Sequence, residues 1–152
     1  MDAAEICDEY AATTTTLPPP TTTTRVPGPS TTLAPSDATD ICGRVSGVPD
    51  RTMVWCPLVA INLAGWGALD LDRLQHNLVI IDCESKGSPT AKNPRSSALG
   101  LYQHIDTFRN NRAWKWLGRA VPDWTDPGDN IAVGVALYVH GGSGHWPNCG
   151  RR

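Results

Sequence analysis

The chain has 152 residues, which is enough for one domain or for a short domain with a tail. Its 13 basic and 15 acidic side chains give a net charge of −2 at pH 7. A charge this close to zero argues against nucleic acid as a partner and against general attraction to an anionic membrane. We also expect no membrane span, because no apolar run approaches the roughly 20 residues that one requires.

The amino terminus reads MDAAEICDEY and lacks both the basic and the apolar region of a signal peptide. We therefore expect no signal peptide in this chain. Three explanations stay open: a mature form, an excised fragment, or a protein that is exported by other means, such as lysis or carriage in a virus particle.

Residues 11–40 consist largely of Thr, Pro, Ser and Ala and include the run TTTTLPPPTTTT. Such a stretch has too little apolar surface to offset its ordering entropy, and its prolines favour an extended chain. Thr/Pro tracts are typical spacers in extracellular and cell-wall proteins. We predict a disordered tail and linker over residues 1–41 and a single folded domain over residues 42–152.

The folded part is predicted to be mainly α. Helices are expected over 53–65, 70–85, 106–117 and 129–140, separated by loops rich in Gly, Pro, Asn and Asp. No convincing strand pattern occurs, although residues 86–97 leave room for a short hairpin.

The predicted helix 70–85 can begin at Asp70 or Asp72, since either is a good N-cap. Its apolar side chains recur in steps of three and four residues and trace one face: Leu71, Leu74, Leu78 and Ile81. A further step of three reaches Glu84, at the carboxyl end of the helix. Most such glutamates are ordinary solvated helix ends. Burial and the negative end of the helix dipole would both raise the pKa of this carboxyl, as a general acid requires.

The predicted helix 129–140 is apolar nearly all round, so we expect it to be buried. Asp129 is its expected N-cap and Gly141 its expected stop. Gly134 at its centre costs about 1 kcal/mol relative to alanine. The close approach of another helix would explain that glycine.

Five cysteines stand at positions 7, 42, 56, 83 and 149. None forms a C-x-x-C pair, so zinc is not expected even though His140 and His145 have a suitable spacing. Two disulfides and one odd cysteine fit an oxidising compartment, and five buried thiols in a cytosolic protein are the alternative. Cys7 is then the odd thiol or an intermolecular tether of an otherwise monomeric protein.

Three blocks of sequence are informative together, and the first begins at Glu84. Residues 84–93 read ESKGSPTAKN and residues 97–103 read SALGLYQ, and a later block over 126–138 reads DPGDNIAVGVALY. In this order the blocks resemble the transglycosylase SLT and goose-type lysozyme family. Two further segments resemble the lead-in and the closing segment of actinobacterial members: WCPL at 55–58 and GHWPNC at 144–149. The resemblance covers about residues 53–150 and implies a lysozyme-like fold and a peptidoglycan-cleaving enzyme.

The resemblance implies that Glu84 is the single catalytic acid and that Gln103 lines the cleft and hydrogen-bonds substrate. It also implies that Gly100 keeps the cleft wall free of a side chain, unless it is a plain turn glycine. Asn93 stands where many members have a serine near the acid. Tyr138 faces the same region in relatives, with a core tyrosine as the alternative.

Other positions carry weaker expectations. Asn130 is expected to bond backbone at the start of its helix, and Asp106 to be the N-cap of a helix over 107–117. Larger transglycosylases have an A-Y-N motif behind the cleft, and His140, His145 or Trp146 is expected to replace part of that wall here. Trp146 is also the tryptophan that we expect near the sugar path, since indole faces stack on sugars.

A single carboxylate suffices for a transglycosylase, which closes a 1,6-anhydro ring on the muramoyl sugar, whereas a lysozyme-type muramidase usually needs a second one. The second carboxylate has four candidates, none placed by a motif: Asp106, Asp123, Asp126 and Asp129. We therefore favour a lytic transglycosylase acting on peptidoglycan glycan strands, with no metal and no organic cofactor. The alternatives are a muramidase and a catalytically silent wall-binding or virion-structural module.

Two further expectations complete the prediction. The disulfides are predicted to join Cys42 to Cys56 and Cys83 to Cys149, and the second would hold the end of the catalytic helix against the closing segment. The expected location is extracellular or in the cell wall, with a virion-associated or phage-encoded lysin as the alternative.

Overall fold

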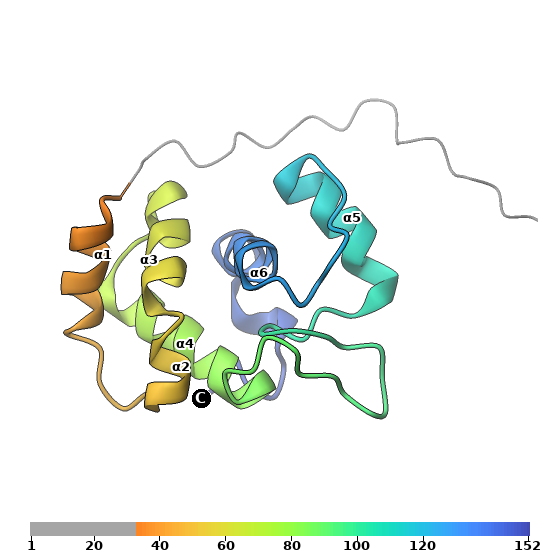
Figure 1. Cartoon of the computed structure of the whole chain (residues 1–152), viewed down its shortest axis with the longest axis horizontal. Coiled ribbons are helices and arrows are strands. Elements are labelled where there is room, and N and C mark those ends of the chain that lie inside the picture. The colour runs from red at the N-terminus through yellow and green to blue at the C-terminus, as the bar shows by residue number, and fades with distance from the viewer. Residues whose placement is uncertain (1–32) are drawn as a thin grey trace, which may run out of the picture.

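The computed structural model describes residues 33–152, which fold into helices joined by loops (Figure 1). In chain order the helices are α1 (Pro35–Cys42), α2 (Asp50–Met53), α3 (Cys56–Gly65), α4 (Leu71–Ser85), α5 (Asp106–Leu117), α6 (Pro127–Gly141) and the 3₁₀ helix η1 (Gly142–His145). The mainly α class is confirmed. Over these residues no strand forms, and the hairpin considered for 86–97 is replaced by a loop with isolated bridges from Leu99 to Lys92 and to His104.

Helix α1 lies in the segment that we expected to be linker. It begins at Pro35, which is preset for a first helical turn, and it packs against α3 (Figure 1). Ala38 is completely buried in this contact, and Cys42 at the end of α1 is bonded to Cys56 at the start of α3. The folded part therefore begins before the boundary expected at residue 42. The earlier part of the expected linker, and Cys7, lie outside the described residues.

Helix α6 runs through the middle of the molecule, with α3 on one side and α5 on the other (Figure 1). Its burial confirms the prediction made from its apolar composition: Ile131, Val133, Val135 and Ala136 are fully buried. Asp129 is not its cap, however. The helix begins at Pro127, and Asp126 accepts a hydrogen bond from the Asp129 backbone N–H at 2.9 Å. Proline lacks the N–H of the first turn, so the cap lies directly before it.

Gly134 in α6 allows a close approach, but the neighbour is not a helix. A Cβ at this position would lie 2.4 Å from Cδ2 of Tyr102, whose ring is fully buried. Tyr102 belongs to the loop between α4 and α5, and its hydroxyl donates to Asn77 Oδ1 at 2.7 Å. The missing side chain therefore makes room for an aromatic ring that fixes this loop on the core.

The structure contains two disulfides, which join the pairs expected from the sequence. Cys42–Cys56 links α1 to α3, and Cys83–Cys149 links the end of α4 to the closing segment. Within the described residues, none of the helices has the length and apolar character needed to cross a bilayer.

Candidate active site

Glu84 occupies the second-to-last position of α4, and the helix orients it as the sequence pattern predicted. Asp70 caps the helix by accepting a hydrogen bond from the Arg73 N–H at 2.8 Å. Leu74, Leu78 and Ile81 on the same face are fully buried, which brings Glu84 to the edge of the core. The helix ends at Ser85, and the left-handed backbone of Lys86 directly after it (φ 55°) turns the chain into the loop that follows.

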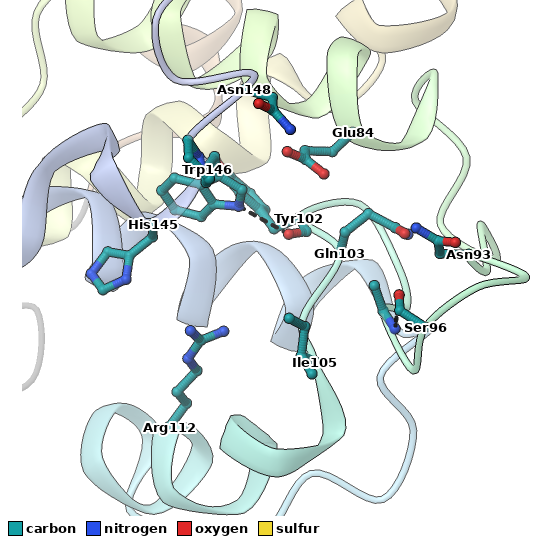
Figure 2. Close-up of a pocket in the computed structure, with 12 residues that line it drawn as sticks. Glu84, Asn93, Ser96, Tyr102, Gln103, Ile105, Arg112, His145, Trp146 and Asn148 are labelled. Carbon is teal, nitrogen blue, oxygen red and sulfur yellow. Dashed lines mark hydrogen bonds between the residues drawn. The ribbon is translucent and has the colours of Figure 1, made fainter.

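A pocket of about 240 Å³ opens beside Glu84 (Figure 2). Its walls come from the end of α4, the loop between α4 and α5, helix α5 and the closing segment. The polar and aromatic side chains that share it with Glu84 are Asn93, Ser96, Tyr102, Gln103, Arg112, His145, Trp146 and Asn148. Segments that are distant in the sequence thus meet at one carboxylate.

The Glu84 carboxyl is half-buried, and this burial raises its pKa above the usual value for glutamate. None of the ion pairs formed within residues 33–152 involves Glu84, so no cation offsets the effect of burial there. Glu84 is also the one carboxylate among the residues that line this pocket. A raised pKa favours the protonated form of this carboxyl, which is the form that a general acid needs in order to donate a proton.

Asn130 of α6 holds the loop that forms the pocket floor. Its Oδ1 accepts from the Tyr102 backbone N–H at 2.9 Å, and its Nδ2 donates to the carbonyls of Trp124 (2.8 Å) and Leu99 (3.3 Å). The side chain is buried. Asn130 therefore bonds backbone at the start of its helix, as expected, and does not touch the pocket.

Gly100 is required by this same arrangement. A Cβ on it would lie 2.1 Å from Nδ2 of Asn130 and 2.5 Å from the Trp124 carbonyl oxygen, and its φ is +81°. Gly100 is not among the pocket-lining residues. The structure therefore accounts for this glycine by its contact with Asn130 and by its backbone conformation, not by a sugar-facing wall.

Gln103 does line the pocket, in an unusual backbone conformation (φ 52°). Its Nε2 donates to the carbonyls of Ala91 at 2.9 Å and of Gly100 at 2.8 Å. Both bonds use the nitrogen, so the Oε1 acceptor is available to a ligand. Asn93 lies beside Gln103 in Figure 2, and it also lines the pocket.

Trp146 lines the pocket but is almost completely buried. Its Nε1 donates to the Tyr102 carbonyl at 3.0 Å, so the indole also anchors the pocket floor. Tyr138 does not line this pocket. Its hydroxyl instead lies 3.0 Å from Nδ1 of His76 in α4. Of the six expected site residues, the structure brings together Glu84, Asn93, Gln103 and Trp146.

The wall expected from His140, His145 or Trp146 is formed by the last two. His145 lines the pocket next to Trp146, whereas His140 packs against the rings of Trp66 and Trp116, with centroids 4.8 and 4.5 Å away. The closing segment therefore supplies one side of the pocket.

Asn148 was missed in the sequence, although its neighbours were not. It directly precedes Cys149, which is bonded to Cys83, the residue before Glu84. The disulfide thus places Asn148 next to the end of α4, and Figure 2 shows its amide facing the Glu84 carboxylate. Asn148 could have been identified from the sequence as the neighbour of Cys149, because the predicted bridge to Cys83 brings it close to Glu84.

Residues 73–140 match the family model for the transglycosylase SLT domain. The stretch from α4 to α6 is thus similar to a transglycosylase SLT domain. Members of this family are lytic transglycosylases, which cleave glycosidic bonds in peptidoglycan, and they share a lysozyme-like fold. The match begins inside α4 and ends in α6, so it contains Glu84 and Gln103 and leaves out the closing segment. No curated protein and no solved structure matches the chain.

The match to the SLT family model indicates an enzyme that cleaves glycosidic bonds in peptidoglycan. In the part of the chain that the structure describes, no three His, Cys, Asp or Glu side chains come close enough to bind a metal ion.

Two aspartates that were candidates for a second carboxylate, Asp106 and Asp123, do not line the pocket. Asp106 is exposed and accepts hydrogen bonds from Ser97 Oγ at 2.6 Å and from the Thr107 N–H at 2.7 Å, which lower its pKa. It is the first residue of α5, with Ile105 at the cap position, so the expected N-cap role is wrong by one residue. Asp123 accepts from the hydroxyl and the N–H of Thr125, which also lowers its pKa.

The other two aspartates have structural partners as well. Asp126 caps α6, and Asp129 forms an ion pair with Arg119. Neither lines the pocket. All four aspartates thus make ordinary contacts at helix starts and turns.

Proposed function

We propose that this SLT domain cleaves the β-1,4 bond between N-acetylmuramic acid and N-acetylglucosamine and leaves a 1,6-anhydro end on the muramoyl sugar. The observation that carries the proposal is Glu84: it is half-buried, its pKa is raised, and it is the one carboxylate lining the pocket. A hydrolase of the usual two-carboxylate kind requires a second group to activate water. An intramolecular transfer does not.

In the proposed reaction Glu84 acts twice. The protonated carboxyl first donates its proton to the oxygen of the leaving sugar as the glycosidic bond breaks. The resulting carboxylate then takes the proton of the C6 hydroxyl of the muramoyl sugar, and that oxygen bonds to C1. No water is consumed, and Glu84 ends protonated again. A raised pKa suits the first step, because it increases the protonated fraction of the carboxyl, and it makes the carboxylate a stronger base for the second step.

Gln103, Asn93 and Trp146 are proposed to hold the sugars. Gln103 offers Oε1 as an acceptor, with its Nε2 held by two backbone carbonyls, and this suits the N–H of an acetamido group. Asn93 lies at the same side of the pocket and can bond sugar hydroxyls. Trp146 lines the same pocket and is proposed to contact a sugar there.

The test is cell-wall zymography of the full chain with Glu84→Gln. This change keeps the shape of the side chain and removes the transferable proton, so lysis should fall by about 100-fold or more, the range that general acids supply. Asp106→Asn and Asp123→Asn are matched controls that also remove one carboxylate, and they should keep wild-type lysis. Activity of Glu84→Gln within a few-fold of wild type would remove Glu84 from the mechanism.

The proposed setting follows from the substrate. An enzyme of this kind belongs in the extracellular space or the cell wall, with a virion-associated lysin as the second possibility. A silent wall-binding module would give no clearing in the zymogram with any variant, so the same assay separates it from an enzyme.

A further inference from the structure

The pocket beside Glu84 also contains a cation that the proposed reaction does not use. Arg112 of α5 lines the pocket and is half-buried. Figure 2 shows its side chain rising from α5 toward the pocket, while Glu84 enters from the end of α4. A guanidinium that is partly withdrawn from water loses hydration, and this loss lowers the pKa of Arg112. Such a group favours an anionic partner.

Arg112 is oriented by a buried histidine that cannot neutralise it. His104 Nε2 lies 3.1 Å from the Asn130 carbonyl oxygen, which can only accept, so Nε2 carries the ring proton. The bare Nδ1 then accepts from the Arg112 guanidinium at 3.2 Å. Burial lowers the pKa of His104 to about 3, so the ring is neutral at physiological pH. His104 therefore fixes the direction of the guanidinium and leaves its charge uncompensated.

Phe108 contacts the same side chain through its ring. The guanidinium carbon of Arg112 lies 5.1 Å from the centroid of the Phe108 ring, one turn earlier in α5. One face of the guanidinium is thus covered by a ring, and one N–H is used by His104. The remaining N–H donors, in a fixed plane, form the fork that matches a carboxylate.

No carboxylate of the described chain occupies that fork. The ion pairs found within residues 33–152 are Arg51–Asp82, Arg73–Asp70 and Arg119–Asp129. Arg109, one turn from Arg112, shows the contrast, because its guanidinium donates to the backbone carbonyls of Ser97 and His104. Arg109 is a structural residue, whereas Arg112 is held in place and still open to a ligand.

We propose that Arg112 binds a carboxylate carried by the muramoyl unit, and that the pocket thereby selects anionic peptidoglycan strands over neutral glycans. This inference rests on the proposed function, since it concerns the substrate of the same pocket. Two sources of the carboxylate share this chemistry. On strands without stem peptides it is the lactyl carboxylate itself, and on strands with stems it is a carboxylate of the peptide.

The experiment measures binding, so that it does not depend on cleavage. The full chain carrying Glu84→Gln is titrated with three soluble glycan strands: strands with stem peptides, strands whose stems an amidase has removed, and strands whose carboxylates have been converted to neutral methylamides. Each strand is also titrated with the double variants Glu84→Gln/Arg112→Gln and Glu84→Gln/Arg112→Lys. Glu84→Gln/Lys115→Gln is the matched control, because Lys115 is an exposed cation on the same helix and does not line the pocket.

Arg112→Gln should weaken binding by about tenfold or more to at least one of the two anionic strands, as expected for a lost hydrogen bond between charged groups. The strand that loses affinity identifies the source of the carboxylate. Neutral strands should bind Glu84→Gln and Glu84→Gln/Arg112→Gln with equal affinity. The control Glu84→Gln/Lys115→Gln should bind every strand like Glu84→Gln. Arg112→Lys should restore part of the lost affinity, because it keeps the charge without the fork.

Three results would overturn the inference: no loss with Arg112→Gln on either anionic strand, the same loss on neutral strands, or an equal loss with Lys115→Gln. If Arg112→Gln lowers the melting temperature, a comparison that leaves Arg112 in place still tests the inference. Glu84→Gln alone should bind neutral strands about tenfold more weakly than anionic strands. Equal affinity there also overturns the inference. Cleavage by the wild-type chain is scored separately, so an inert protein with Arg112-dependent binding would refute the proposed reaction and leave this inference standing.

Discussion

Glu84 shows how a single residue acquires its chemistry from its surroundings. The spacing of apolar residues along α4 predicted its place at the edge of the core, and the structure confirms that place. Its raised pKa follows from burial without a compensating cation in the described chain. This environment favours the protonated form and makes the ionised form unfavourable to bury.

The same burial predicts an effect of Glu84→Gln on stability. Because the pKa is higher in the folded state than in the unfolded state, the folded protein binds more protons between the two values, and stability falls as pH rises through that window. Above it, wild type buries an ionised carboxylate and Glu84→Gln does not. The variant should therefore melt at the same temperature as wild type or higher at pH 7, with the difference vanishing below about pH 4, where both states are protonated.

Thermal melts of both proteins over this pH range provide the measurement. A melting temperature of Glu84→Gln clearly below that of wild type at pH 7 would show that the carboxylate stabilises the fold, contrary to the raised pKa. Cleavage by wild type should also decline as pH rises above the Glu84 pKa, because the first step needs the protonated carboxyl.

Gly134→Ala tests the contact that sets the pocket floor. The added methyl would lie 2.4 to 2.7 Å from ring atoms of Tyr102, and that ring cannot move freely because Asn77 accepts its hydroxyl. Overpacking of this kind costs about 1–3 kcal/mol. Replacing glycine by alanine in a helix gains about 1 kcal/mol in helix propensity, so the cost outweighs the gain over most of that range. We expect a lower melting temperature and reduced lysis.

Gly144→Ala is the control for this change, because a Cβ at Gly144 meets no atom within 4 Å. It should melt like wild type. A Gly134→Ala protein as stable and active as the control would mean that the ring of Tyr102 yields easily and does not fix the loop.

The position of a single residue could be predicted from the sequence where it depends only on the residue's own segment. Glu84 and Asn130 lie in helical patterns that can be read locally. Gly100 was assigned to a sugar-facing wall because its neighbours in space, Asn130 and Trp124, come from segments that the local motif does not mention. Arg112 was missed for the same reason, since its orientation depends on His104 in the preceding loop.

At the scale of elements, the decisive connection is that between α4 and the closing segment. Cys83 and Cys149 adjoin Glu84 and Asn148, so one disulfide positions both sides of the pocket. Cys42–Cys56 instead fastens α1 to α3, away from the pocket. The two bridges should therefore differ in their effect on activity.

Replacing each pair of cysteines by alanine separates these effects. In the loop-entropy account, the bridges contribute about 3 kcal/mol for Cys42–Cys56 and about 4 kcal/mol for Cys83–Cys149. Both variants should melt earlier than wild type. Assayed well below either melting temperature, Cys42→Ala/Cys56→Ala should keep most of its lysis, whereas Cys83→Ala/Cys149→Ala should lose most of it.

Equal activity of the two disulfide variants under those conditions would mean that hydrogen bonds suffice to hold the closing segment, such as those of Trp146 to the Tyr102 carbonyl and of His76 with the Gly150 carbonyl. Peptide mapping under non-reducing conditions checks the pairing itself. Cys42 joined to Cys149 would contradict it.

Elements with a strong internal pattern were predicted within a few residues, as α4, α5 and α6 show. Helix α1 was not predicted, because its eight residues, PSDATDIC, are mostly the small and polar types of the linker before them, and packing on α3 and a disulfide stabilise it. The break between α2 and α3 was also missed, where Pro57 stands in the first turn of a new helix. Tertiary contacts decide such short helices, and local propensity does not.

At the scale of the whole molecule, the pocket is assembled from segments on both sides of α6: the end of α4, the loop before α5, α5 itself and the closing segment. The fold class and the family could be predicted from the sequence because the motif blocks line up along the chain in the order of the family. The Thr/Pro-rich spacer stays a prediction for residues 1–32, which lie outside the described residues.

In the proposed reaction one carboxylate acts without water, so the end group of the product distinguishes this reaction from hydrolysis. Purified peptidoglycan is digested with the full chain, and the released muropeptides are analysed by mass spectrometry before and after borohydride reduction. We predict muropeptides that end in 1,6-anhydromuramic acid, one water lighter than the hydrolysis products and unchanged by borohydride. Predominantly reducible ends would contradict the claim and show that water is the acceptor.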